Sequence, residues 1–316
     1  MKKILLYTTL FVTCFIAKVN AQSDQLQTNY LFNPLMYNPA YASVNDFMSA
    51  NLMTRLQWLK SGMANNTYTG TIQSTFPGSD KMAAGLQIQA DKYSIYSNFT
   101  IKLNYAYKLP LTDYMDLHMG LQGVFDNYNV NYNELTMSLP GESAPAETAF
   151  GANVNESRMN FGTGLYLVNQ NRFYLSASIP RILNNNLNNS GDTISQQNFK
   201  RSYYLSGGMV FGADGNLPVR PSFMVRYDEQ FKHNVSYDLN CTFLLSHVLW
   251  AGVGVRDLNT ICLIGQLDVT DHVRGAFSYD MPLQTGTGSN TWGTFELGLS
   301  VNTAIFSNQT VQQRYF

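Results

Sequence analysis

The stretch from Lys81 to Asp126 contains three segments in which apolar and polar residues alternate strictly. Period-two alternation indicates β-strands with two unlike faces. The apolar face carries no charge, whereas the opposite face carries charges of both signs. A soluble sandwich would bury the apolar face against a second sheet, and a membrane barrel would turn it to lipid. The apolar residues are Met82, Ala84, Leu86, Ile88 and Ala90, then Phe99, Ile101, Leu103, Tyr105, Tyr107 and Leu109, then Met115, Leu117, Met119, Leu121 and Phe125.

The composition is compatible with the membrane barrel. Charged residues make up 13% of the 316 residues and aromatic residues another 13%, while the mean hydropathy is only −0.17. Barrels keep a moderate hydropathy because lumen-facing polar residues alternate with lipid-facing apolar ones. After the N-terminal segment the sequence has no unbroken apolar run of about 18 residues, which excludes ordinary transmembrane helices.

Residues 1–21 have the pattern of a signal peptide. Two lysines precede an apolar core at Ile4–Ala17, and Val19-Asn20-Ala21 offers a small-residue cleavage site. The mature chain would start at Gln22 with a net charge of −4. The sequence has no basic patch of the kind that would indicate binding to nucleic acid. The sequence therefore predicts export to an outer membrane.

Residues 22–45 do not have the pattern of a strand. They carry two Asn-Pro pairs, Asn33-Pro34 and Asn38-Pro39, among aromatic residues. Asn-Pro favours turns and disfavours helix at the residue before the proline. An irregular aromatic segment needs a surface that covers its rings. We therefore predict that it packs into, or across, the periplasmic mouth of a barrel, with a disordered leader as the alternative.

Residues 46–301 predict an all-β fold, a transmembrane antiparallel outer-membrane β-barrel of about 14 strands. An Arg or Lys on the lipid face near the midplane would cost about 2–4 kcal/mol. Five arginines instead fall on the inward phase of the predicted strands: Arg158, Arg220, Arg226, Arg256 and Arg274. This agreement between charge and strand phase favours the barrel over the sandwich.

The predicted connections differ in length between the two ends of the barrel. When the predicted strands are counted along the chain, the connections after the second, fourth and later even-numbered strands are short. Two connections after odd-numbered strands are long, namely Asn127–Glu156 and Arg181–Lys200. Short periplasmic turns and longer external loops are typical of outer-membrane barrels. We therefore expect both termini in the periplasm and residues 302–316 as a C-terminal periplasmic tail. The terminal Phe316 leaves a barrel-assembly signal open as the alternative role of the tail.

Large inward residues favour a plugged lumen over an open channel. An open aqueous pore typically needs 16–18 strands, which is more than this chain provides. Balanced acids and bases on facing strands would hold the interior through ion pairs. The large inward residues are Tyr166, Tyr174, Met224 and Trp250, and two cysteines, Cys241 outward and Cys262 inward, fall on non-adjacent strands.

The sequence gives little support for an enzyme, and no cofactor or metal is expected. The histidines lie far apart and lack metal-ligand spacing. His118 is predicted inside the barrel beside Asp116 and Asp126, where a satisfied lumen histidine is the simpler interpretation. A hydrolase such as an outer-membrane phospholipase would need Ser, His and an orienting polar group together.

The segment Phe32–Ala42, with both Asn-Pro pairs, resembles the start of the PorP/SprF family. Further similar stretches cover the rest of the mature chain, among them Arg55–Trp58, Tyr105–Leu111, Leu117–Gly123, Asn160–Tyr166, Phe173–Ser176 and Gly293–Leu297. The resemblance implies an outer-membrane protein of the type IX secretion and gliding motility machinery of Bacteroidetes. Some members belong to the secretion apparatus, and others retain a large adhesin at the cell surface by recognising its C-terminal domain.

We therefore expect a barrel that binds and retains a secreted adhesin at the cell surface. One alternative is a core secretion component that contacts periplasmic partners, and another is a FadL-like transporter of small molecules. The expected partners are the adhesin or its C-terminal domain, other type IX secretion components and the lipid membrane. The candidate partner-binding residues lie in the two long loops, Asn127, Pro140, Pro145, Asn184 and Asn188, and the periplasmic motif is Asn33, Pro34, Asn38 and Pro39.

Overall fold

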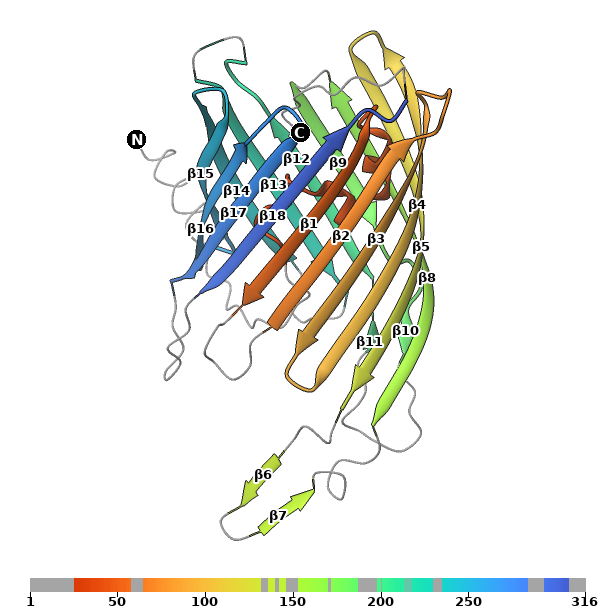
Figure 1. The fold of residues 1–316 in the computed structure, drawn as a ribbon, viewed down its shortest axis with the longest axis vertical. Coiled ribbons are helices and arrows are strands. Elements are labelled where there is room, and N and C mark those ends of the chain that lie inside the picture. The colour runs from red at the N-terminus through yellow and green to blue at the C-terminus, as the bar shows by residue number, and fades with distance from the viewer. Residues whose placement is uncertain are drawn as a thin grey trace, which may run out of the picture.

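A computed structural model describes residues 26–57, 65–131, 136–139, 142–145, 153–169, 172–186, 198–199, 201–213, 215, 217–229, 235–283 and 293–306. Within these residues, fourteen strands form a closed antiparallel barrel, and pairing of the first strand with the last closes the cylinder (Figure 1). The predicted fold class is confirmed. The predicted signal peptide and most of the C-terminal tail lie outside the described residues.

The barrel strands follow the chain order, and each pairs with its sequence neighbours in the barrel. They are β1 (Met48–Gln57), β2 (Asn65–Thr75), β3 (Met82–Tyr93), β4 (Tyr96–Thr112), β5 (Met115–Val130), β8 (Val154–Asn169), β9 (Phe173–Ile179), β12 (Ser202–Met209), β13 (Val219–Asp228), β14 (Val235–Leu245), β15 (Leu249–Arg256), β16 (Thr260–Asp268), β17 (Val273–Pro282) and β18 (Thr294–Thr303). Asn302 and Thr303, which the sequence placed in the tail, belong to β18.

Two small hairpins lie in the long connections. The connection between β5 and β8 contains β6 (Thr136–Leu139) paired with β7 (Glu142–Pro145). The connection between β9 and β12 contains β10 (Asn185–Asn186) paired with β11 (Asn198–Phe199). Both hairpins are two-stranded sheets separate from the barrel.

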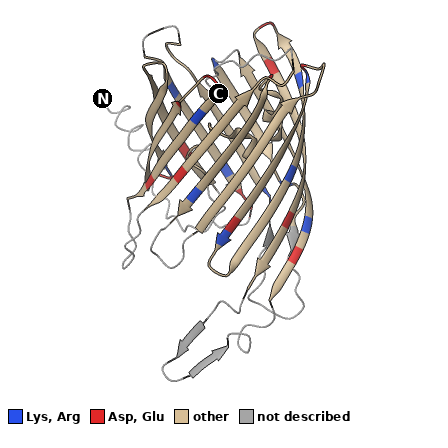
Figure 2. Ribbon diagram, in the orientation of Figure 1, with Lys and Arg blue, Asp and Glu red and all other residues tan. Residues whose placement is uncertain are grey.

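Side-chain burial alternates along the strands as the sequence predicts. Outward residues such as Leu52 and Leu103 are each 64% exposed, whereas inward Arg220 and Arg226 are 1% and 2% exposed. The other three arginines predicted to face inward form ion pairs with carboxylates and are mostly buried. Figure 2 marks the charged positions on the strands. The lumen holds the charges, and the outer face is the apolar surface that a bilayer requires.

The two ends of the barrel carry different connections. The short-turn end is the end at which β1 begins and at which the β2–β3 and β4–β5 turns lie. The loop end is the opposite end, with the β5–β8 and β9–β12 connections (Figure 1). Tight turns occur at both ends, since Ser246-His247 and Asp257-Leu258 each have two consecutive positive φ angles, as in type I′ hairpins.

One side of the wall extends further toward the loop end. There β4, β5 and β8 are much longer than β9 (Figure 1). Asn127 pairs with Ser157 on β8 and with Phe99 on β4. The expectation that Asn127 begins a loop is therefore wrong. The apolar alternation stops near Phe125, whereas backbone pairing continues to Val130.

Residues 26–47, here called the lumen segment, precede β1 and lie inside the barrel (Figure 1). Two short 3₁₀ helices form in it, η1 (Pro34–Met36) and η2 (Pro39–Ser43), each starting with the proline of an Asn-Pro pair. Proline suits the first helical position because its φ is fixed and no N–H is lost there. The Asn38 side chain caps η2 by accepting a hydrogen bond from the Ala40 N–H at 2.9 Å.

Candidate functional site

A network of ion pairs lines the lumen near the loop end. Arg256, the last residue of β15, donates to Asp238 at 2.9 Å and to Asp280 at 3.0 Å. Arg55 on β1 bridges Asp280, at 3.2 Å, and Glu296. All five side chains are largely buried. Each of the three carboxylates lies beside at least one of the two guanidinium groups, as buried ionised groups require.

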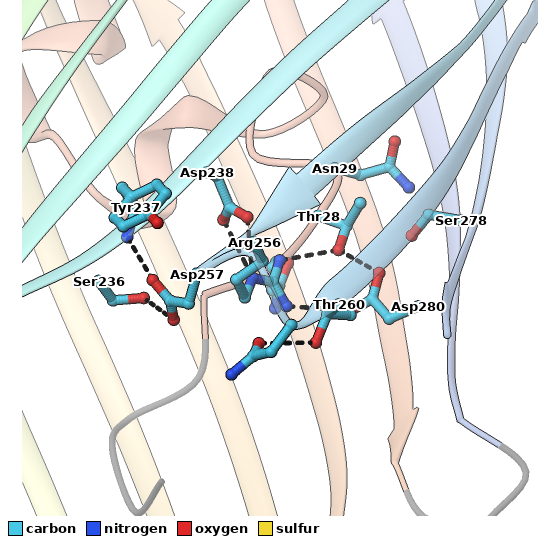
Figure 3. A network of polar contacts seen from close by, with 12 residues as sticks. Thr28, Asn29, Ser236, Tyr237, Asp238, Arg256, Asp257, Thr260, Ser278 and Asp280 are labelled. Carbon is cyan, nitrogen blue, oxygen red and sulfur yellow. Dashed lines mark hydrogen bonds and ion pairs between the residues drawn. The ribbon is translucent and has the colours of Figure 1, made fainter. Parts of the chain in front are cut away.

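The lumen segment is tied into this network at Thr28 and Asn29, a contact that we call the loop-end attachment. The Glu296 carboxylate accepts the backbone N–H groups of Thr28 and Asn29, both at 2.9 Å. The Thr28 hydroxyl accepts from Arg256 at 2.8 Å and donates to Asp280 (Figure 3). A carboxylate that accepts hydrogen bonds from two consecutive backbone N–H groups fixes the path of the chain, and the two donors stabilise its negative charge.

Buried polar contacts also order the wall at β13, where Tyr30 of the lumen segment is held. Arg220 on β13 lies over the Trp250 ring, 4.2 Å from its centroid, and donates to Thr242 and Gln266. The Tyr30 hydroxyl donates to Ser222 at 2.9 Å. Trp250 is 1% exposed, so this cation–π contact is fully buried.

A second attachment joins η2 to the opposite wall, and we call it the wall attachment. Asn38 donates to the Leu165 carbonyl and to the Ser176 hydroxyl, both at 2.8 Å. A Cβ at Gly164 would lie 1.9 Å from the Asn38 Oδ1 atom. A Cβ at Gly120, the residue paired with Gly164, would lie 2.1 Å from the Ala40 nitrogen. The backbone of η2 therefore packs directly against Gly120, and the Asn38 side chain that caps η2 packs against Gly164.

Apolar packing completes the wall attachment. Leu35, Ala40 and Ala42 are fully buried in one cluster with Tyr166 and Tyr174. The four large residues predicted to face inward, Tyr166, Tyr174, Met224 and Trp250, are all buried as expected.

The loop end contains a third inward element, residues 180–183, which follow β9. The Arg181 guanidinium binds both carboxylate oxygens of Asp126, at 2.8 and 3.0 Å. The Pro180 carbonyl accepts from Gln122 at 2.6 Å, and Asn160 accepts the N–H groups of the two residues after Arg181. Because Gln122, Asp126 and Asn160 line the inner face, this stretch folds across the lumen side of β5 and β8.

The space left between these elements is small. A cavity of about 10 Å³, lined in part by Tyr30, Tyr37, Tyr174 and Met224, holds about one water molecule. Among the described residues, side chains and the lumen segment occupy much of the lumen, since most inward residues of the wall are buried.

The candidate residues fall in different places. Asn33, Pro34, Asn38 and Pro39 all lie in the lumen segment, where Asn33 accepts from Thr71 at 3.1 Å. Asn184 lies next to β10, Pro145 ends β7 and Asn127 lies on β5, while Pro140 and Asn188 lie outside the described residues. The structure therefore gathers the motif residues in one place and leaves the loop candidates spread over the loop end.

Catalytic chemistry has little geometric support. His118 hydrogen-bonds through Nδ1 to the Ser43 hydroxyl at 2.8 Å, but both side chains are buried by the lumen segment and the wall. In the part of the chain that the structure describes, no group of three or more His, Cys, Asp or Glu side chains is placed to hold a metal ion. No described helix is long and apolar enough to cross a bilayer.

The comparison with family models gives one match, which runs from residue 19 to residue 301. The matching model is the type IX secretion system membrane protein PorP/SprF. The chain belongs to the PorP/SprF family. This PorP/SprF chain is therefore an outer-membrane barrel of a secretion-system family, which is a non-enzymatic kind of protein. No curated protein matches it.

Solved structures similar to this PorP/SprF chain are outer-membrane barrels. A CymD monoaromatic hydrocarbon channel aligns with a TM-score of 0.54 at 11% identity, covering 91% of this chain and 95% of that one. A FadL homologue of Pseudomonas aeruginosa aligns with a TM-score of 0.49 at 11% identity, covering 84% and 92%. At such identities the likeness establishes the fold alone.

Sequence reasoning did not find the role of Glu296 in this PorP/SprF chain. The alternation places Glu296 and Asp280 on inward faces, but it gives no sign that Glu296 binds the backbone of a segment far away in sequence. One signal was available, because Arg55 is an inward arginine that needs an inward acid as its partner.

Proposed function

We propose that this chain is a plugged outer-membrane barrel that retains a secreted partner at the cell surface, with the loop end outside. The partner is an adhesin or its C-terminal domain, as expected for the family. One observation carries the proposal: the lumen segment fills the barrel between two walls, anchored to Glu296 on one side and to Gly120 and Gly164 on the other. A filled barrel offers a rigid platform to a partner.

The extended wall supports a docking role for the loop end. The outer faces of β5 and β8 change from apolar to polar there, since Asn127 and Asn129 follow Phe125, and Asn155 and Ser157 precede Met159. Asn127 donates to Asn155 at 3.0 Å and to Ser157 at 2.9 Å across the two strands. A polar outer face belongs outside the hydrocarbon layer. This part of the sheet would stand above the bilayer, next to the long connections.

The direct test is to remove the long connections. Residues 132–152 and 187–197 would each be replaced by a short turn, and the adhesin would be measured in the cell and medium fractions. We expect the adhesin to appear in the medium while the barrel stays in the outer membrane. As the matched control, residues 77–79 of the β2–β3 turn, at the other end, would be exchanged for a different turn without releasing the adhesin.

The outcome also separates the two secretion roles. Continued surface retention after both replacements would reject the loop end as the docking site. If the β2–β3 exchange alone disturbed secretion, the chain would instead act as a core component that contacts a periplasmic partner at the short-turn end.

A small-molecule transporter is the second candidate, because CymD, a hydrocarbon channel, shares the fold. The filled lumen argues against it, since inward residues of the wall such as Gln87 and Ser278 are fully buried, as is Ser43 of the lumen segment. Planar-bilayer recordings of the purified barrel should stay closed. A sustained open conductance would favour the transporter.

A further inference from the structure

The lumen segment contacts the wall at successive heights. Its Thr28 meets Arg256 and Glu296, which lie beside the loop-end limits of β15 and β18. Arg256 directly precedes the β15–β16 turn at the loop end. Figure 3 shows Thr28 between Arg256 and Asp280, at this level of the wall. This part of the segment therefore lies near the loop end.

The middle of the lumen segment meets the middle of the wall. The Asn33 side chain accepts from Thr71, which lies within β2, away from either end. The Met36 carbonyl accepts from Lys102 Nζ at 3.0 Å, and Lys102 lies in the interior of β4.

The last part of the segment meets the short-turn end. Ser43 hydrogen-bonds to His118, close to the start of β5. Asp46 binds Lys108 at 3.2 Å, near the end of β4, and its carbonyl accepts from Thr75, the last residue of β2. Two residues after Asp46, the chain enters the wall as β1.

The contacts of Thr28, Met36 and Asp46 run from the loop end toward the short-turn end, while the Tyr37 hydroxyl reaches back to the Gln27 N–H. A segment that only covered the short-turn mouth would meet the wall near that mouth at both of its ends. The sequence predicted packing into, or across, the periplasmic mouth, and these contacts extend along the height of the barrel. A tilted strand of 9–11 residues spans a bilayer, so a segment with contacts at both ends of such strands crosses it too.

We propose that the chain ahead of β1 crosses the membrane inside its own barrel, with Thr28 near the loop end and Asp46 at the short-turn end. The proposal depends on the proposed function in one respect, namely which face of the barrel lies outside the cell.

The first experiment compares three tagged versions of the full-length protein. An epitope tag with a flexible spacer is inserted directly ahead of Leu26, in the β6–β7 turn as the loop-end marker, or between Ser79 and Asp80 as the short-turn marker. Antibody labelling is measured on intact cells and on opened outer membranes. We expect the tag at Leu26 to label from the same face as the loop-end marker. Labelling from the face of the short-turn marker, or from neither face, overturns the proposal.

A second experiment tests the path without any tag. The Thr28 hydroxyl donates to Asp280, the residue paired with Cys262 across β16 and β17, and Cys262 lies near the loop-end start of β16. Thr28→Cys should therefore form a disulfide with Cys262 under a thiol oxidant such as dipyridyl disulfide, seen as a faster-migrating unfolded band without reductant. Thr28→Cys combined with Cys262→Ser should form none, because Cys241 lies on another strand. Absence of the crosslink in the first variant overturns the path.

The failures of the two proposals are distinguishable. If the tag at Leu26 and the loop-end marker label together from the periplasmic face, the crossing stands and the orientation in the proposed function fails. If they label together from outside but shortening the long connections releases no adhesin, the crossing also stands and the docking site fails.

Discussion

The two attachments of the lumen segment use different physics. The loop-end attachment is built from charge, because Glu296, Asp280, Arg55 and Arg256 pair with one another and also with Thr28 and Asn29. The wall attachment is neutral and depends on shape, since the Ala40 backbone packs against Gly120 and the Asn38 side chain against Gly164. Removing a carboxylate from the first takes a charged acceptor from its partners, whereas adding a Cβ at either glycine of the second creates a collision with the lumen segment.

The substitution Glu296→Gln tests the loop-end attachment and should have the largest effect. Glu296 accepts hydrogen bonds from Arg55 and from the backbone N–H groups of Thr28 and Asn29, and a hydrogen bond to a charged group contributes about 1.5–3 kcal/mol, so the loss of these bonds should cost about 3 kcal/mol. Arg55 would keep only Asp280, and two backbone N–H groups would lose a charged acceptor. We expect a loss of this size in the free energy of unfolding, measured by urea titration in detergent. Asp80→Asn, at an exposed turn, is the control and should change little; equal effects would contradict the charged attachment.

The wall attachment is tested by Gly120→Ala. Its Cβ would collide with the Ala40 backbone, and such overpacking costs about 1–3 kcal/mol. The matched control is Gly123→Ala on the same strand, where a Cβ has no described atom within 4 Å. The same urea titration should separate the two variants. If both lost the same stability, strand propensity rather than contact with η2 would be the cause.

Asn38→Ala probes the polar part of the wall attachment. It removes the cap of η2 and the donors to Leu165 and Ser176, and loss of a cap typically costs about 0.5–2 kcal/mol. Asn38→Asp keeps the cap acceptor and loses only the donors. We expect the Asp variant to be less stable than the native chain because the carbonyl oxygens of Leu165 and Ala177 would then face a carboxylate. Native stability in both variants would mean that shape alone holds η2.

The smallest effect is expected at the short-turn end. Lys108→Ala removes the pair with Asp46, whose side chain is 38% exposed, and exposed pairs contribute about 0–1 kcal/mol. Thermal melting monitored by heat-modifiable gel mobility should shift only slightly. A loss as large as that of Glu296→Gln would place the main charged anchor at the wrong end of the segment.

The barrel was predictable because lipid imposes one rule on every strand. A charge may not face the hydrocarbon, so Arg220 and Arg226 fix the phase of β13, and alternation fixes the phase of the others. The same rule explains the error at Asn127. The alternation of apolar residues indicates how far a strand is in contact with lipid. The strand β5 continues beyond that point, because its backbone hydrogen bonds need no apolar face.

The path of the lumen segment was not predictable. Its residues have no period, and the contacts that fix it come from strands far apart in sequence, such as Glu296 for Thr28 and Lys102 for Met36. Gly164 gave a partial signal: a strand glycine often marks close backbone approach, but the sequence does not say which backbone approaches.

Pairing of β1 with β18 has a consequence for how the molecule is made. The lumen segment continues directly into β1, and β1 joins β18 along its full length, from Met48 opposite Thr303 to Gln57 opposite Thr294. The β1–β18 seam therefore closes around a segment that is covalently joined to one of its own two strands, so placing the segment and closing the cylinder are coupled steps of assembly.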